Sequence, residues 1–138
     1  MKLASRKLAT PSDRQRELRR TDRIRAQLLR EAFPELAELR VEMTFADGTA
    51  TPPSAQAHAF YPGARVFFRF ACPCSDCGGE FDLTTAISAA LAGGKRAATD
   101  GRMPCEGMRR GTQAEPFPCP VSLRYRITAR DEPKRNLP

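Results

Sequence analysis

The sequence has a single histidine, His58, and none of the short motifs that usually carry catalysis. It contains no nucleotide-binding glycine motif, no G-x-S-x-G elbow and no H-E-x-x-H helix. His58 stands among alanines and far in sequence from every cysteine, which favours a surface position in a loop. We therefore predict that the protein is not an enzyme.

Long hydrophobic runs are also missing, since none approaches the roughly 18 apolar residues that a membrane-spanning helix needs. The first seven residues, MKLASRK, lack the apolar stretch of a secretory signal. Both absences predict a cytoplasmic protein without a membrane partner, with an organelle transit peptide ending near Ser12 as the alternative. In a reducing compartment cysteines remain thiols, so clustered cysteines favour a metal site over disulfides.

Five cysteines are the strongest signal that the sequence does contain. Cys74 and Cys77 are separated by two residues and followed by two glycines, a spacing that lets a tight turn direct two thiolates at one ion. Two later cysteines can complete a tetrahedral set. The predicted metal ligands are Cys74, Cys77, Cys105 and Cys119, with Cys72 as the alternative ligand in place of Cys74.

The segment CSDCG, residues 74–78, resembles the turns of small zinc-ribbon and zinc-knuckle proteins. The resemblance implies a structural Zn²⁺ held by four thiolates, which leaves no open position for a catalytic water. An iron-sulfur cluster also uses cysteine thiolates and is the alternative cofactor. Buried cysteines without any metal are a third reading, because a free cysteine is often a small buried hydrophobe.

Positive charge is concentrated at the start of the chain. Residues 1–30 hold ten Lys or Arg against three Asp or Glu, and this excess of +7 equals the net charge of the whole protein. Such asymmetry indicates a polyanionic partner, because neutralising phosphates releases condensed counterions. The arginines predicted to contact nucleic acid are Arg14, Arg16, Arg19, Arg20, Arg23 and Arg25, joined by Arg124, Arg126 and Arg130 on a late strand.

Hydrophobic patterning predicts helices at two places. Residues 13–32 contain no Gly or Pro and should form a helix whose first half projects into solvent. Residues 82–91 should form a short helix, capped by Asp82 and ended by the glycines at 93 and 94. A further helical turn is expected at residues 34–38, after Pro34.

Strands are predicted where apolar residues alternate with polar ones, at residues 39–45, 64–72 and 121–130. Residues 47–63 are rich in Pro, Ala, Thr and Ser and are expected to form a long loop. Asp100 and Gly101 have the sequence of a tight turn.

These elements predict an α+β fold, in which a small antiparallel sheet of three or four strands packs with a short helix and is stapled by zinc. The expected organisation is a basic helical arm at residues 1–33, a zinc-stabilised domain at 34–130 and a flexible tail at 131–138. The predicted function is association with nucleic acid, most plausibly structured RNA or the ribosome.

Two features leave other readings open. The arginines at 124, 126 and 130 also fit the solvated side of a strand, whereas an aromatic such as Phe67 on their face would suit stacking on an unpaired base. The alternative function is a zinc-stabilised adaptor whose arginines pair with an acidic protein partner. Its apolar contacts would come from Ile24, Leu28, Leu29 and Phe33.

Overall fold

A computed structural model describes residues 11–48, 53–74, 77–94, 97–110 and 115–133. Helices α1 (Pro11–Arg25) and α2 (Leu29–Ala32) precede strands β1 (Leu36–Ala46), β2 (Ser54–Phe60), β3 (Arg69–Ala71) and β4 (Glu80–Asp82). Helix α3 (Thr84–Leu91) and the short 3₁₀ helix η1 (Ala92–Gly94) follow. The last strands are β5 (Thr99–Pro104), β6 (Met108–Arg110), β7 (Pro116–Pro118) and β8 (Ser122–Asp131).

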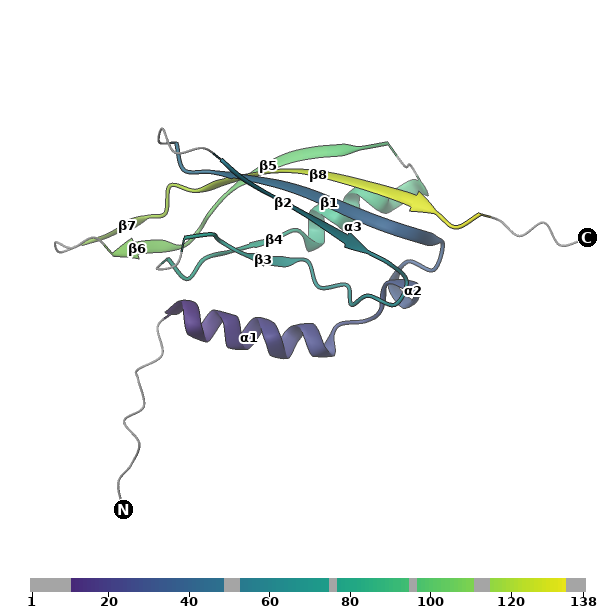
Figure 1. Ribbon diagram of the computed structural model, residues 1–138, viewed down its shortest axis with the longest axis horizontal. Helices are drawn as coiled ribbons and strands as arrows, with labels where there is room; N and C mark the ends of the chain where they lie inside the picture. Colours follow the sequence, from purple (N-terminus) through teal and green to yellow (C-terminus); the bar gives the residue numbers. More distant parts are fainter. Residues whose placement is uncertain (1–10, 49–52, 75–76, 95–96, 111–114, 134–138) are drawn as a thin grey trace, which may run out of the picture.

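The main sheet has four antiparallel strands in the order β2-β1-β8-β5 (Figure 1). Alternation along β1 and β8 turns one side chain in two towards the interior, because successive residues of a strand point to opposite faces. The interior side of these strands is almost completely buried at Leu39, Val41, Met43, Leu123 and Ile127. The predicted α+β fold with a small antiparallel sheet is therefore present, and we call the exposed side of the sheet its outer face.

The core lies between the inner side of the sheet and the elements that cover it. Helix α3 contributes Ile87 and Leu91, and Phe81 of β4 packs its ring against Phe45 of β1 at 5.5 Å between centroids. The residue that caps α3 is Leu83 and not, as predicted, Asp82, although the Asp82 carboxylate accepts a hydrogen bond from the Thr84 amide at 2.9 Å just before the helix. No described helix is long and apolar enough to cross a membrane.

Strand β2 corrects the prediction of a long loop at residues 47–63. It pairs with β1 over seven residues, from Leu39 opposite Phe60 to Phe45 opposite Ser54. Its inward residues include Gln56 and His58, so polar side chains interrupt the apolar alternation that identifies a strand in sequence. His58 is consequently half-buried on a strand, with its ring 4.9 Å from that of Phe70.

Two further predictions about local structure were wrong. Residues 36–38 belong to β1 and not to a helical turn, and Asp100 and Gly101 lie within β5 and not in a tight turn. Gly101 faces Tyr125 across the sheet, and a Cβ on it would meet the tyrosine ring at 2.2 Å. The glycine therefore serves close packing within a sheet, a use that its sequence context does not reveal.

The strand predicted at residues 64–72 is reduced to β3, because the preceding backbone pairs elsewhere. The Leu29 amide donates to the carbonyl of Ala64 at 2.7 Å, and the Val66 amide donates to the carbonyl of Gln27 at 2.8 Å. These bonds hold the chain against the link between α1 and α2. Helix α1 accordingly ends at Arg25, seven residues earlier than predicted, and Leu29 is completely buried in the core.

Candidate metal centre and nucleic-acid interface

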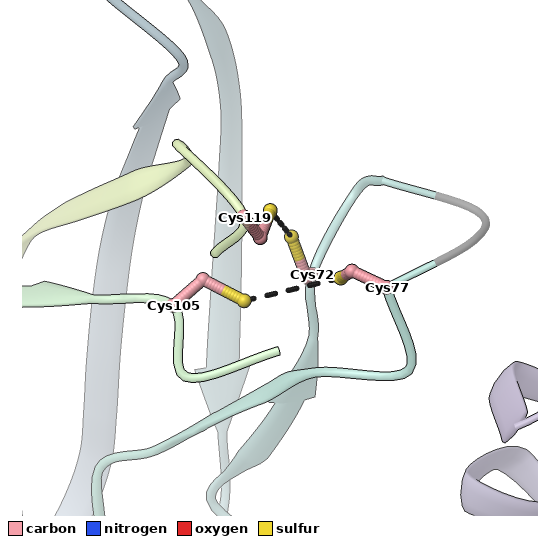
Figure 2. Close-up of side chains that lie close together, drawn as sticks. All are labelled: Cys72, Cys77, Cys105 and Cys119. Atoms are coloured by element: carbon pink, nitrogen blue, oxygen red, sulfur yellow. Dashed lines mark hydrogen bonds between the residues drawn. The ribbon is translucent and has the colours of Figure 1, made fainter. Parts of the chain in front are cut away.

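Four cysteine thiols point toward one another in the structure (Figure 2). The Sγ atoms all lie within 4.8 Å of one another, with the pair from Cys72 and Cys119 and the pair from Cys77 and Cys105 each at 3.9 Å. Sulfur atoms around a tetrahedral zinc, with Zn–S near 2.3 Å, lie about 3.8 Å apart. The four residues are buried, and this spacing lets their sulfurs hold one metal ion.

Two short ribbons of strand position the cysteines. Cys72 follows β3 and Cys77 precedes β4, and these two strands pair with each other. Cys105 precedes β6 and Cys119 follows β7, which form the second pair. The site therefore lies where two hairpin ribbons meet, beside the end of the main sheet (Figure 1).

The two ribbons use the same local arrangement. Gly79 donates its amide to the Cys77 sulfur at 3.3 Å, and Gly107 donates its amide to the Cys105 sulfur, also at 3.3 Å. The Cys72 amide donates to the Gly79 carbonyl at 3.1 Å, and the Cys119 amide donates to the Gly107 carbonyl at 2.9 Å. Each ribbon therefore presents two sulfurs beside a glycine turn, in the manner of a metal-binding turn.

Glycine is required where the two ribbons meet, because the turn that contains Gly79 lies against the turn that contains Gly107. A Cβ on Gly79 would lie 2.5 Å from the Cys105 sulfur. A Cβ on Gly107 would lie 2.8 Å from the Cys77 carbonyl oxygen and 3.0 Å from its sulfur. The repeated Cys-x-Gly pattern, residues 77–79 and 105–107, is a sequence signal for the site that our prediction did not use.

The group of four contains the alternative ligand Cys72, whereas the first-choice ligand Cys74 lies outside it. Cys74 is half-buried and lines a hollow of about 230 Å³ together with Pro73 and Arg109. The hairpin register explains the choice, because β3 and β4 bring Ala71 opposite Glu80 and so leave Cys72 beside the Cys77 turn. Burial raises the pKa of the Cys72 thiol, so a thiolate there needs a compensating positive charge.

The six predicted arginines of α1 do not all project into solvent. Arg14 and Arg25 are exposed, but Arg19 is half-buried and lies 3.5 Å from the Glu80 carboxylate at its closest approach. Figure 1 shows α1 running alongside the β3–β4 ribbon. The helix, the ribbon and strand β2 together line a hollow of about 360 Å³, which we call the α1 groove. Its lining residues are Arg16, Arg19, Arg20, Arg23, Arg69, Gln56, His58, Phe70 and Ala71.

A chain of ion pairs holds α1 against the ribbon. Arg69 of β3 donates from Nε to Glu80 at 2.9 Å and from Nη1 to Asp22 of α1. Glu80 in turn faces Arg19 of α1, so each partner supplies one acid and one arginine. Arg19 and Arg69 are thus both neutralised by carboxylates. These contacts fix the helix directly beside the cysteine turn that ends at Gly79.

The remaining charge of the α1 groove is less compensated. In the described part of the chain Arg20 has no ion-pair partner, and Arg23 stacks over Phe67 with its guanidinium 5.1 Å from the ring centroid. Burial, and secondarily the charge of Arg23, lowers the pKa of His58 and leaves its ring neutral near pH 7. Phe67 is itself buried on this side of the molecule, so it does not share a face with the arginines of β8.

The three arginines predicted on the last strand lie on the outer face of the main sheet. Arg124, Arg126 and Arg130 are all exposed. Arg126 bonds to Asp100 at 2.9 Å, and Arg130 lies 3.4 Å from Glu38. These two arginines are therefore engaged by neighbouring strands, whereas Arg124 is not paired with an acid among the described residues.

Comparison with known proteins found no matching family model, no similar curated protein and no similar solved structure.

Proposed function

We propose that the protein is a zinc-stabilised RNA-binding protein whose α1 groove contacts the phosphate backbone. The observation that carries the proposal is the gathering of five arginines, four from α1 and Arg69 from β3, around one hollow. Only Glu80 and Asp22 neutralise them at the helix-ribbon contact, which leaves Arg20 and Arg23 without carboxylate partners among the described residues. Rows of guanidinium groups suit phosphate oxygens, which they can bind through two parallel hydrogen bonds.

Zinc is the metal that the donor set supports best. Four cysteines with no histidine or carboxylate among them favour Zn²⁺ or an iron-sulfur cluster. Sulfur separations of 3.9 Å suit a single ion at the centre of a tetrahedron. With four thiolates bound, zinc would have no open position for substrate, so its role would be to join the two ribbons.

The way α1 is held favours RNA over duplex DNA. A recognition helix reads DNA with the side chains on the face that points away from its own domain into the major groove. Helix α1 is instead tied along the ribbon by Arg19 and Asp22. A basic groove that follows a backbone, with the neutral ring of His58 in its lining, suits a single-stranded or irregular RNA segment.

The experiment is a salt titration of RNA binding by the zinc-loaded full chain, measured as fluorescence anisotropy with a labelled single-stranded RNA. The test variant is Arg16→Gln with Arg20→Gln, which removes two exposed arginines of the groove. Removing two phosphate contacts should reduce the slope of log affinity against log salt by about 1.4, since each contact to single strands contributes about 0.7. Affinity at low salt should fall as well.

A matched control is Arg40→Gln with Arg130→Gln, which changes the net charge equally on the outer face. It should bind RNA with nearly the wild-type salt dependence. Equal weakening by the control pair would contradict the groove and leave only unspecific attraction to a basic protein. Deleting residues 1–30 would be a poor test, because it would remove Leu29 from the core.

Exposed apolar residues on α1 favour the adaptor as the second candidate. Leu18 is 56% exposed and Ile24 is 66% exposed. Two other residues of the predicted apolar surface are used internally, since Leu29 is fully buried and Phe33 packs against the core. An adaptor that pairs with a second copy should self-associate in sedimentation experiments. The double variant Leu18→Ala with Ile24→Ala should lose that association. Such an adaptor should also bind RNA weakly, even at low salt.

A further inference from the structure

The outer face of the main sheet carries charges in nearly balanced pairs. Three arginines on this face each have a carboxylate partner, and Arg126 lowers the pKa of Asp100 through their hydrogen bond. The pairs are Arg126 with Asp100 at 2.9 Å, Arg130 with Glu38 at 3.4 Å and Arg40 with Glu42 at 3.4 Å. Two further arginines of this face, Arg102 and Arg124, belong to none of these pairs.

Arg102 of β5 and Arg124 of β8 are direct cross-strand partners. Residues opposite each other in an antiparallel pair have Cβ atoms about 4.5–5.5 Å apart, and like charges in this position destabilise the sheet. Both side chains are exposed, and in the described part of the chain neither forms an ion pair. The sheet therefore holds two uncompensated guanidinium groups side by side.

A hollow of about 640 Å³ lies over this pair. Thr44 of β1 stands next to Arg124 in the same cross-strand row and adds a hydroxyl group to the lining. At the other end of the hollow lie Asp100 and Glu42, each already engaged by an arginine. The hollow thus has a cationic end with hydrogen-bond donors and an end where the charges are balanced.

We propose that Arg102 and Arg124 form a binding site for a terminal phosphate group. A phosphate dianion between the two guanidinium groups would accept hydrogen bonds from both and remove their mutual repulsion. Among the described residues the far end offers no unpaired cation for a second phosphate, because its acids and arginines already pair with one another, so the ligand carries one phosphate.

This site does not rest on the proposed function, because it lies on the side of the sheet opposite the core, whereas α1 packs with the elements on the inner side (Figure 1). Its phosphate can come from a small phosphorylated molecule or from the end of a nucleic acid. The chemistry that Arg102 and Arg124 recognise is the same in both cases.

The test is a titration of zinc-loaded protein with inorganic phosphate, followed through the side-chain Nε–Hε signals of arginine in ¹H–¹⁵N NMR spectra at constant ionic strength. The Arg102 and Arg124 signals should shift with saturation. Arg124→Gln and, separately, Arg102→Gln should each lower the affinity roughly tenfold, as loss of a charged hydrogen bond implies. Arg130→Gln is the matched control and should leave it unchanged.

A second readout uses stability, and both variants alter exposed side chains. Without phosphate, Arg124→Gln should melt at or above the wild-type temperature, because it removes like-charge repulsion. Phosphate should raise the wild-type melting temperature more than that of the variant.

Two results would overturn the site. The first is arginine chemical shifts that change linearly with phosphate concentration and do not saturate, and the second is an equal loss of phosphate affinity in Arg130→Gln. The source of the phosphate follows from the ratio of the affinity for a 5′-phosphorylated RNA to the affinity for the same RNA without the phosphate. A lower ratio in Arg124→Gln than in the wild type would identify nucleic acid as the source. An unchanged ratio, with inorganic phosphate still bound by the wild type, would identify a small ligand.

Discussion

At the level of single residues, the candidate metal site depends on which thiols the hairpin register brings together. The C-x-x-C spacing of Cys74 and Cys77 indicates a turn, but the pair that closes the β3–β4 ribbon is Cys72 with Cys77. Cys72 continues the strand beside the turn, and its amide is bound to the Gly79 carbonyl. Spacing along the chain therefore located the site, and backbone pairing selected its members.

Substituting single cysteines tests this selection. Cys72→Ser should lose stoichiometric zinc, because three thiolates and a hydroxyl bind the ion less tightly than four thiolates. Cys74→Ser should retain one zinc per chain, since its sulfur lies outside the group. Metal analysis of freshly purified, reduced protein measures both. The reverse result would return Cys74 to the ligand set, and a coloured wild-type protein would indicate an iron-sulfur cluster.

Gly107 should tolerate no side chain. Gly107→Ala would place a methyl group within 2.8 Å of the Cys77 carbonyl oxygen, and overpacking of this kind costs about 1–3 kcal/mol of unfolding free energy. Zinc affinity should fall too, because the two turns would be pushed apart. Gly63→Ala is the control, since a Cβ there has no atom within 4 Å. Chemical denaturation of both zinc-loaded variants compares them, and equal stability would contradict the close contact.

At the level of elements, the notable feature is how α1 is attached. The helix offers exposed Leu18 and Ile24 and relies for its placement on Asp22 and Arg19, which meet Arg69 and Glu80. Arg69 lies three residues before Cys72 and Glu80 three residues after Cys77. A helix held mainly by ion pairs is thereby fastened to the one part of the molecule that the metal would stabilise.

Glu80→Gln should release α1 while the main sheet stays folded. The substitution keeps the shape of the side chain but removes the charge that two arginines share, at a cost of about 1–3 kcal/mol. Hydrogen exchange should quicken for the amides of α1 and remain slow for those of β1 and β8. Glu42→Gln, on the outer face, is the matched control. Unchanged protection of α1 would show that its packing does not need the ion pairs.

At the level of the whole molecule, the cysteines join segments that are far apart in the chain. Cys72 and Cys119 are separated by 47 residues, and the four buried cysteines belong to the same core as the sheet and α3. The ribbons have only three residue pairs each, so they have little stability of their own. A metal ion at their junction would set the position of the ribbon and, through it, of α1.

Removal of the metal should therefore weaken RNA binding without any change in the arginines. We expect chelation to lower the melting temperature, to speed hydrogen exchange in β3, β4 and α1, and to reduce RNA affinity at low salt. Adding back Zn²⁺ should restore all three, which separates reversible loss of the ion from aggregation. RNA affinity that survives chelation would mean that α1 binds phosphate without its support on the ribbon.

The sequence was sufficient where local patterns agree with the final fold. Strict alternation predicted β8, and an apolar helical face followed by two glycines predicted α3, because both patterns reflect the burial of one face of the element. The cysteine spacing predicted a possible metal site, and the charge count located the basic segment. Each of these depends on residues close together in the chain.

Tertiary structure decided what depends on distant partners. Strand β2 forms because β1 offers its edge, although Gln56 and His58 break the apolar pattern. Cys72 joins the metal group because β3 pairs with β4, and α1 lies along the ribbon because Arg69 and Glu80 meet it there. Hydrogen bonds and ion pairs between remote segments determine these features, and no local pattern of residues encodes which segments will meet.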